Sequence, residues 1–152
     1  MKKVMFISSG GGHLNELLRL QPLFSKTIPI LVVEKQKFPL QVSEKVVFLP
    51  RGTRKKLAQY CFIFMWLCLK SCFLYFKYRP DVIVTTGSHT AVPMCYIASF
   101  FKKQIIFIES IARVHSKSLT GKLIEKKCTH ILVQWESMLE LYPQATYIGQ
   151  IL

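Results

Sequence analysis

Short apolar runs alternate along the chain with longer stretches in which apolar residues recur at helical spacing. The apolar runs predict strands at 4–7, 28–33, 46–49, 81–85, 104–108, 131–133 and 147–148. The longer stretches predict helices at 14–24, 54–78, 91–101, 116–127 and 136–141. Runs that are apolar throughout are typical of strands buried on both faces of a parallel sheet. The pattern therefore predicts an α/β fold, a single Rossmann-like doubly wound parallel sheet in one domain over residues 1–152.

Length and composition agree with this class and exclude others. The chain has 152 residues, 51% of them apolar and 19% charged, so it can bury a core and is not a disordered chain. Its five cysteines form no CxxC pair, and no histidine stands at metal-ligand spacing. We therefore expect reduced thiols, no metal and no cofactor. The apolar run after Met1 is too short for a secretion signal, which predicts a cytoplasmic protein.

The positive charge is concentrated in one segment. The chain has 21 Lys and Arg against 8 Asp and Glu, a net charge of +13. Residues 51–79 contain no acidic residue but carry Arg51, Arg54, Lys55, Lys56, Lys70, Lys77 and Arg79. These basic residues flank apolar sequence and do not alternate with exposed aromatic residues. The pattern favours an anionic membrane surface as partner and disfavours nucleic acid.

The helix predicted within residues 54–79 is apolar enough to suggest a membrane. Seventeen of the 20 residues from Leu57 to Phe76 are apolar, but Lys70 interrupts them. A helix that crossed a bilayer would also separate the first three predicted strands from the last four. We expect a helix that packs partly on the sheet and dips partly into a membrane face; the alternative is a fully buried core helix with a solvated basic rim. The predicted membrane-binding residues are Arg51, Arg54, Lys55, Lys56, Trp66, Lys77 and Arg79.

Three loops follow predicted strands and precede helices, which is where ligands bind in a sheet of this class. The loop 8–13 contains three consecutive glycines, whose backbone N–H groups can approach a phosphate or diphosphate; the alternative is a plain tight turn. The loop 85–90 offers hydroxyl groups, a glycine and an imidazole. The candidate diphosphate-binding residues of these loops are Gly10, Gly11, Gly12, Gly87, Ser88, His89 and Thr90. Their spacing matches neither a dinucleotide fingerprint nor a Walker loop.

Two residues in the first and third loops are candidate catalytic groups. His13 stands beside the glycines at a helix start, where an imidazole could act as a general base. Glu109 directly follows the fifth strand, where a carboxylate could accept hydrogen bonds from sugar hydroxyls or take a proton. In the alternative, Glu109 pairs with Arg113 and only holds the loop 109–118. Arg113 is also a candidate ligand of a diphosphate.

Four parts of the sequence together resemble one family. They are Gly11-Gly12-His13, Thr86 to Pro93, Ile108 to Arg113 with Ser118 to Lys122, and Val133-Gln134-Trp135 with Tyr142-Pro143. The chain resembles, over essentially its whole length, the membrane-side subunit of split GT-B glycosyltransferases. Members include the subunit that anchors the eukaryotic transferase adding the second N-acetylglucosamine to dolichol-linked oligosaccharide. Bacterial members act in capsule and exopolysaccharide synthesis, among them the enhancer of a capsular β-1,4-galactosyltransferase.

The resemblance implies a division of labour between two chains. This chain would be equivalent to the N-terminal half of a GT-B enzyme, and a separate donor-binding subunit would hold the UDP-sugar. The resemblance further implies a polyprenyl-diphosphate-linked saccharide as acceptor and a peripheral or monotopic position at the cytoplasmic face of the plasma membrane. The eukaryotic subunit has an N-terminal transmembrane helix, whereas this sequence begins on its first strand, so we expect anchoring through 54–79. We expect Trp135, Tyr142 and the end of the chain, 151–152, to help the partner dock.

Several functions stay open at this point. In the leading hypothesis the chain recruits and activates its catalytic partner and contributes His13 and Glu109 to the active site. The alternative is a purely non-catalytic membrane anchor or enhancer that contributes no active-site residue. A self-sufficient enzyme acting on a sugar nucleotide is disfavoured, because half of a GT-B cleft lacks a donor site.

Overall fold

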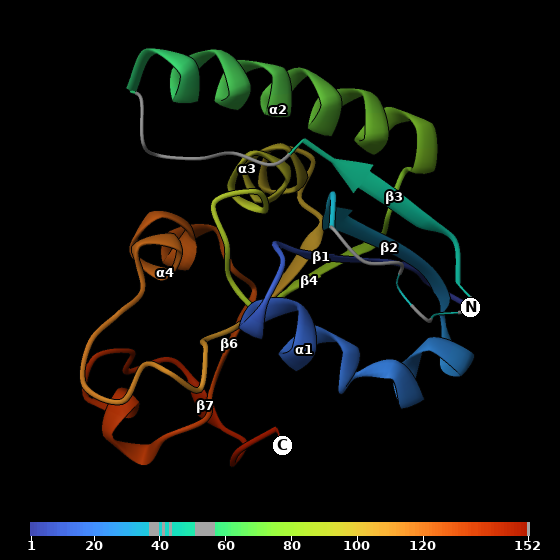
Figure 1. Cartoon of the computed structure of the whole chain (residues 1–152). Helices are drawn as coiled ribbons and strands as arrows, with labels where there is room; N and C mark the ends of the chain where they lie inside the picture. The colour runs from blue at the N-terminus through green and yellow to red at the C-terminus, as the bar shows by residue number, and fades with distance from the viewer. Residues whose placement is uncertain (37–39, 41, 43, 51–56, 152) are drawn as a thin grey trace.

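Parallel strands form the centre of the molecule. The computed structural model describes residues 1–36, 40, 42, 44–50 and 57–151, and within them one seven-stranded sheet has the order β3-β2-β1-β4-β5-β6-β7 (Figure 1). The strands are β1 (Lys3–Ser8), β2 (Ile28–Glu34), β3 (Val46–Leu49), β4 (Val82–Thr85), β5 (Gln104–Ile108), β6 (His130–Val133) and β7 (Thr146–Tyr147). Every neighbouring pair is parallel. The predicted single α/β sheet is confirmed, and the strand order reverses between β1 and β4, where such sheets open a ligand-binding crevice.

Helices lie on both faces of the sheet (Figure 1). One face carries α2 (Leu57–Tyr78), α3 (Val92–Phe100), α4 (Leu119–Ile124) and the short 3₁₀ helix η2 (Glu125–Lys127). The other face carries α1 (Gly12–Leu18) and the 3₁₀ helix η1 (Gln21–Lys26). A further 3₁₀ turn, η3 (Glu136–Leu139), connects β6 to β7. This two-sided cover is the reason that the strands read as continuous apolar runs.

Three of the predicted helices are shorter than expected. The first ends at Leu18, and Phe24 lies instead in η1, which begins next to Pro22. The helix expected from residue 116 begins only at Leu119, because the Ser118 hydroxyl accepts the Gly121 N–H and caps it. The segment 136–141 makes a single 3₁₀ turn. The start of the long helix, predicted at Arg54, lies outside the described residues.

The long helix α2 is apolar on both sides, but only one side is buried. Its inner side packs on the core through Leu67, Leu74 and Tyr75. The exposed side chains recur at helical spacing and are 53–69% exposed; they are Phe62, Met65, Trp66, Leu69, Phe73 and Phe76, the α2 face. The stretch Tyr60–Tyr78 is long and apolar enough to cross a membrane, and only 22% of it is buried. The alternative of a fully buried core helix is therefore wrong.

Lys70, the charged residue in the middle of α2, ties the helix to the sheet. Its ammonium group donates a hydrogen bond to the backbone carbonyl of Phe48 in β3. The neighbouring Ser71 is fully buried against the core. The inner side of α2 is therefore packed on the sheet, as expected for a helix that does not cross a bilayer.

The opposite face of the sheet is only partly covered. The helices α1 and η1 pack there against β1 and β2 through Leu14, Leu17 and Phe24. Beyond them the face leaves an apolar hollow of about 330 Å³, the sheet trough. Its lining includes Val84, Ile106, Leu132, Leu23, Ile148 and Ile151. Each side of the molecule therefore has an exposed apolar surface: the α2 face on one side of the sheet and the sheet trough on the other.

Candidate functional site

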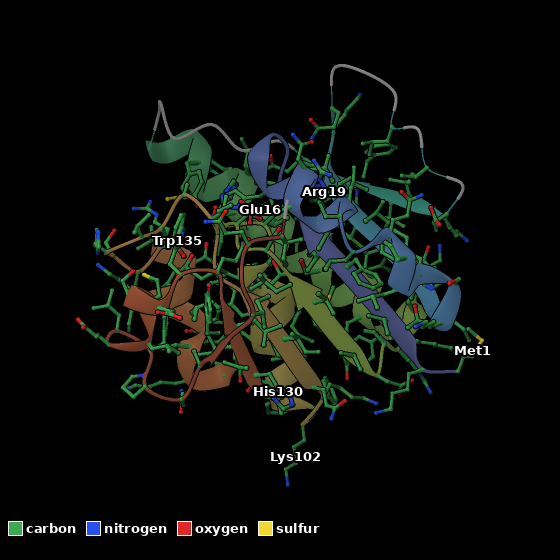
Figure 2. The ribbon with its side chains drawn as sticks, turned by 90° about the horizontal axis from the view of Figure 1, so that it is seen from below. Met1, Glu16, Arg19, Lys102, His130 and Trp135 are labelled. Atoms are coloured by element: carbon green, nitrogen blue, oxygen red, sulfur yellow. The ribbon has the colours of Figure 1, made fainter. Side chains whose placement is uncertain are left out.

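The three loops predicted to bind a ligand meet at one pocket. A hollow of about 180 Å³, the polar pocket, is lined by Ser9, His13, Ser88, His89, Arg113, Ser118, Leu119 and Thr120. These residues come from the loops after β1, β4 and β5 and from the starts of α1 and α4. Parallel strands bring their carboxyl ends to one edge of the sheet, which is why loops so far apart in sequence converge. Figure 2 shows the two ends of the sheet, with Glu16 and Trp135 near this edge and Lys102 and His130 at the other.

The glycine loop leaves its backbone uncovered beside this pocket. Gly11 has φ +73°, a conformation that side chains other than glycine rarely adopt. A Cβ atom built on Gly11 or Gly12 would meet no heavy atom within 4 Å. Gly10 is different, because a Cβ there would collide with the side chain of Gln36. The turn therefore requires glycine at Gly11, a side chain at Gly10 would have to displace the Gln36 amide, and Gly12 keeps open the approach to the backbone.

His13 is held with one ring nitrogen fixed. Its Nδ1 lies 3.1 Å from the carbonyl oxygen of Thr86, and the Thr86 hydroxyl donates to the His13 carbonyl at 2.7 Å. A carbonyl oxygen can only accept, so Nδ1 carries a proton, and in the neutral ring the lone pair lies on Nε2. The half-buried ring lines the polar pocket. The arrangement suits a general base.

The second loop contributes some of its predicted residues to the pocket and uses others to shape itself. Ser88 and His89 line the polar pocket. The His89 Nε2 lies 3.3 Å from the Glu34 carboxylate, and its ring contacts Tyr60 with centroids 6.0 Å apart. Gly87 and Thr90 do not line the pocket. Gly87 takes φ +86° against Phe107, and the buried Thr90 hydroxyl hydrogen-bonds Ser88.

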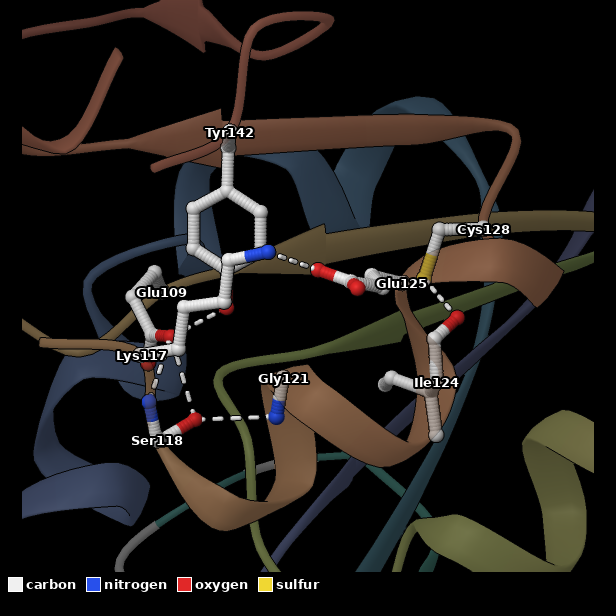
Figure 3. Close-up of polar contacts among 8 residues, drawn as sticks. All are labelled: Glu109, Lys117, Ser118, Gly121, Ile124, Glu125, Cys128 and Tyr142. Atoms are coloured by element: carbon white, nitrogen blue, oxygen red, sulfur yellow. Dashed lines mark hydrogen bonds and ion pairs between the residues drawn. The ribbon is translucent and has the colours of Figure 1, made fainter. Parts of the chain in front are cut away.

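Glu109 is buried and holds the third loop together (Figure 3). Its side chain is 1% exposed, and one carboxylate oxygen accepts the Ser110 N–H at 3.0 Å. The other oxygen accepts the Ser118 N–H and hydroxyl at 3.0 and 3.1 Å and the Tyr142 hydroxyl at 2.8 Å. The alternative in which Glu109 holds the loop is confirmed, but not through Arg113, whose guanidinium donates to Ser116 at 3.4 Å. Nor does Glu109 line the polar pocket, so in this structure the carboxylate organises the loop that carries Arg113 and Ser118.

Tyr142 belongs to the same cluster, so its predicted exposure at a partner interface is wrong. Burial is the main cause that raises the pKa of the Tyr142 phenol, and the neighbouring Glu109 carboxylate adds to it. The phenol therefore stays protonated and donates a hydrogen bond to Glu109. The Lys117 ammonium lies 4.4 Å from the centre of the Tyr142 ring and forms an ion pair with Glu125. A Cβ atom on Gly121 would collide with the Tyr142 hydroxyl, so glycine lets α4 approach the cluster.

Trp135 is also engaged within the chain. Its indole N–H donates to the Ile111 carbonyl at 2.7 Å, and the ring is half-buried. Trp135 is therefore not fully exposed, and its part in docking the partner stays a prediction. Of the predicted chain end, Ile151 packs at the edge of the sheet trough, and residue 152 lies outside the described residues.

Sequence reasoning missed a buried network behind the pocket. Glu16 on α1 accepts the Ser110 hydroxyl at 2.8 Å and the Gln134 amide at 3.2 Å. Gln134 also donates to the Glu109 carbonyl at 3.0 Å and accepts the Ile151 N–H at 2.8 Å. The network joins α1, the loop after β5, the end of β6 and the end of the chain. The available signal was a polar residue at an apolar position, Glu16 between Leu14 and Leu17 and Gln134 directly after a strand.

The predicted membrane-binding residues fall into two groups. Arg51, Arg54, Lys55 and Lys56 lie outside the described residues. Trp66 stands on the α2 face, and Lys77 and Arg79 are exposed at the end of α2.

The structure extends this surface to the end of α3. Phe100 is 81% exposed, and Phe101 stacks on Tyr75 with ring centroids 4.8 Å apart. The side chain of Lys102 follows and points away from the molecule (Figure 2). The paired Phe and Lys residues at 100–103 were the sequence signal for this extension.

The surroundings of Cys95 and Cys128, and of the possible metal ligands, bear on thiol and metal chemistry in this fold. Burial raises the pKa of the Cys95 thiol above its usual range and that of Cys128 to about 12, so both thiols stay protonated. In the part of the chain that the structure describes, no group of three or more His, Cys, Asp or Glu side chains could hold a metal ion.

The sheet, its two-sided helical cover and the pocket at the carboxyl edge define a Rossmann-like domain of the GT-B kind. Acinetobacter baumannii MurG superposes with a TM-score of 0.73 and 12% sequence identity, over 90% of this chain and 43% of that one. UDP-N-acetylglucosamine 2-epimerase from Rickettsia bellii gives a TM-score of 0.76 at 18% identity, over 99% and 45% of the two chains. The chain thus spans less than half the length of each structure, and at these identities the likeness concerns the fold.

The family is narrower. The family model described as "Oligosaccharide biosynthesis protein Alg14 like" matches residues 31–151, and the chain belongs to this family. The UDP-N-acetylglucosamine transferase subunit ALG14 of Mus musculus is 24% identical over 182 residues, covering 98% of this chain and 82% of the relative. The same-named protein of Homo sapiens is 33% identical over 93 residues, 57% of this chain and 42% of the relative. The predicted resemblance to the eukaryotic subunit is confirmed.

Proposed function

We propose that this chain is the membrane-associated, acceptor-binding subunit of a two-chain UDP-sugar glycosyltransferase. It would extend a polyprenyl-diphosphate-linked saccharide at the cytoplasmic face of the plasma membrane, in capsule or exopolysaccharide synthesis, a setting that rests on the sequence resemblance. The observation that carries the proposal is that one helix adjoins the polar pocket and also carries the α2 face: His89, which lines the pocket, contacts Tyr60 near the start of α2. An amphiphilic acceptor needs both features side by side.

The polar pocket suits the diphosphate of such an acceptor. Its walls supply the Arg113 guanidinium, the imidazoles of His13 and His89, and hydroxyl groups. The glycine loop beside it adds open backbone at Gly12. Of the carboxylates nearby, Glu109 is saturated with hydrogen bonds on its buried side, and Glu34 pairs with His89. A guanidinium, imidazoles and hydroxyl donors gathered in one pocket favour an anion.

His13 is the group we assign to the chemistry. With Nδ1 protonated against Thr86, its Nε2 can take the proton of the acceptor hydroxyl as the oxygen attacks the anomeric carbon of the sugar. The new bond joins that oxygen to the sugar, and UDP leaves with the electrons of the broken glycosidic bond. Glu109 then acts indirectly, by fixing the loop that carries Arg113.

A second chain is needed to hold the UDP-sugar in this proposal. The curated relatives are named transferase subunits, and the solved structures that share the fold are more than twice as long as the part matched here. The sheet trough is the surface we assign to that second chain. It is apolar, it is large enough for several side chains, and Ile151 at its edge is tied to the network behind the pocket.

The test uses the chain co-expressed with its transferase partner. His13→Ala should lower the rate of sugar transfer by about 10²–10⁴-fold, the usual contribution of a general base, without changing complex assembly. His130→Ala is the matched control, because His130 is exposed at the opposite end of the sheet and should leave the rate unchanged. A loss under about threefold for His13→Ala would favour the alternative function, a non-catalytic anchor whose partner supplies the base.

A further inference from the structure

We propose that the hydrocarbon chain of the acceptor lipid lies in a groove between α2, α3 and α4 that starts at the polar pocket. The proposal rests on the proposed function, because it takes the polar pocket as the diphosphate site. It adds a second binding site for the same ligand, built mainly from residues to which the proposed function gives no role: Phe64, Val92, Ile97 and Leu123.

Three hollows that share walls make up this route. The polar pocket shares His89, Leu119 and Thr120 with a hollow of about 140 Å³. That hollow shares Phe64, Val92 and Leu123 with a further hollow of about 440 Å³. Since each hollow borders the next, the second and third form one continuous groove leading away from the pocket, here called the lipid groove.

The chemistry of the walls changes along the route. The polar pocket is lined by imidazoles, hydroxyls and a guanidinium, whereas the lipid groove is lined mainly by Phe64, Val92, Ile97 and Leu123. His89 stands at the boundary, with its Nε2 toward Glu34 and its ring against Tyr60. A ligand that fills the whole route must carry an anionic head followed directly by hydrocarbon. A free sugar nucleotide has no apolar part of this kind.

The far end of the groove points to the membrane. Tyr96 and Leu123 line it and are 45% and 46% exposed. The groove runs along α2, whose outer side is the α2 face. A hydrocarbon chain longer than the groove would therefore pass into lipid and not into water. A lipid-linked acceptor has such a chain, and we assign the groove to it because the groove shares walls with the polar pocket and runs along the helix that carries the α2 face.

The experiment separates binding of the head from binding of the tail. The purified chain is titrated with inorganic diphosphate, geranyl diphosphate and geranylgeranyl diphosphate, each below its critical micelle concentration. Leu123→Trp fills the lipid groove. Leu69→Trp is the matched control, since it adds the same side chain to the α2 face outside the groove. Gly12→Val covers the backbone beside the polar pocket and leaves the groove intact.

We expect one variant to affect only binding of the hydrocarbon tail and another to affect binding of the diphosphate head. The wild-type chain should bind the geranylgeranyl compound about tenfold or more tightly than the geranyl compound, because additional apolar groups are buried. Leu123→Trp should lose this gain and keep its affinity for inorganic diphosphate. Leu69→Trp should match the wild type, and Gly12→Val should weaken all three ligands while keeping the gain with chain length.

Several outcomes would overturn the assignment. Equal binding of the two prenyl compounds by the wild type, or an undiminished gain in Leu123→Trp, excludes the lipid groove while leaving the diphosphate site in place. If lysophosphatidylglycerol binds as tightly as the geranylgeranyl compound and is equally sensitive to Leu123→Trp, the groove is instead a binding site for membrane phospholipid. If no diphosphate binds at all, the proposed function fails together with this inference. Leu123→Phe repeats the test should thermal unfolding show that Leu123→Trp is misfolded.

Discussion

Two apolar surfaces lie on opposite faces of the sheet, and they differ in shape and in surroundings. The α2 face is the outer side of a helix, rich in aromatic side chains and followed by Lys77 and Arg79. The sheet trough is a hollow whose floor is made of strand residues such as Val84 and Ile106, and Lys26 alone supplies a charge to its described lining. Aromatic rings with cations beside them suit a lipid interface, whereas a hollow suits a protein segment that fills it. Exposed apolar area alone therefore does not identify a partner; its shape and the neighbouring charge do.

The largest expected effect comes from a charge placed in the sheet trough. Ile106→Asp should abolish sugar transfer by the co-expressed complex and prevent the partner from co-purifying, because a carboxylate buried at the contact would have no partner. Binding to anionic vesicles should stay normal. Ile148→Asp, at the more exposed edge of the trough, repeats the test should Ile106→Asp unfold. If the partner still binds both variants, the trough is not the surface that it contacts.

The converse experiment acts on the α2 face. Replacing Phe62, Trp66 and Phe73 with Ser should weaken binding to anionic vesicles by roughly a thousandfold, since each buried aromatic side chain contributes more than about 1 kcal/mol. The partner should still co-purify. The matched control replaces Leu23, Ile28 and Tyr147 with Ser, three exposed apolar residues away from α2, and should leave vesicle binding intact. Equal loss in both triple variants would show that the vesicle does not distinguish the surfaces.

A smaller effect is expected from the basic residues that precede α2. Replacing Arg54, Lys55 and Lys56 with Glu should weaken binding to anionic vesicles by roughly a hundredfold, as each cation near such a surface contributes about 1 kcal/mol. Binding to neutral vesicles should hardly change, and raising the salt concentration should shrink the difference between variant and wild type. A variant that binds anionic vesicles like the wild type would leave the apolar residues as the sole membrane contact.

The smallest effect is expected from Tyr142→Phe, which tests whether Tyr142 stabilises the fold or contacts the partner. Tyr142→Phe removes one of the four hydrogen bonds that reach the Glu109 carboxylate, so it should lower the free energy of unfolding by about 1–2 kcal/mol. The melting temperature should fall by roughly 3–6 °C in a chain of this size. Partner and vesicle binding should not change. Lost partner binding with an unchanged melting temperature would return Tyr142 to the interface.

Much of the fold could be read from local sequence, and the candidate site only in part. The apolar runs predicted the strands, and the glycines and serines after β1 and β4 marked loops that do meet at the polar pocket. His13 was predicted from its place beside the glycines, and it lines that pocket. Glu109 was placed at the right strand end, but the alternative pair with Arg113 was wrong, and one of its partners, Tyr142, is 33 residues away. No local pattern announces a contact of that kind.

The sequence by itself determined the alternation of strands and helices, the loops at one edge of the sheet and the apolar, basic-flanked segment of α2. These features follow from the spacing of apolar residues and from the conformations open to glycine, which are properties of neighbouring residues. Only the tertiary structure decided which side of α2 is exposed, that Glu109 is buried beneath Tyr142, and that a groove runs from the polar pocket between α2, α3 and α4. These depend on which distant segments pack together, and burial is set by that packing and not by the identity of the residue alone.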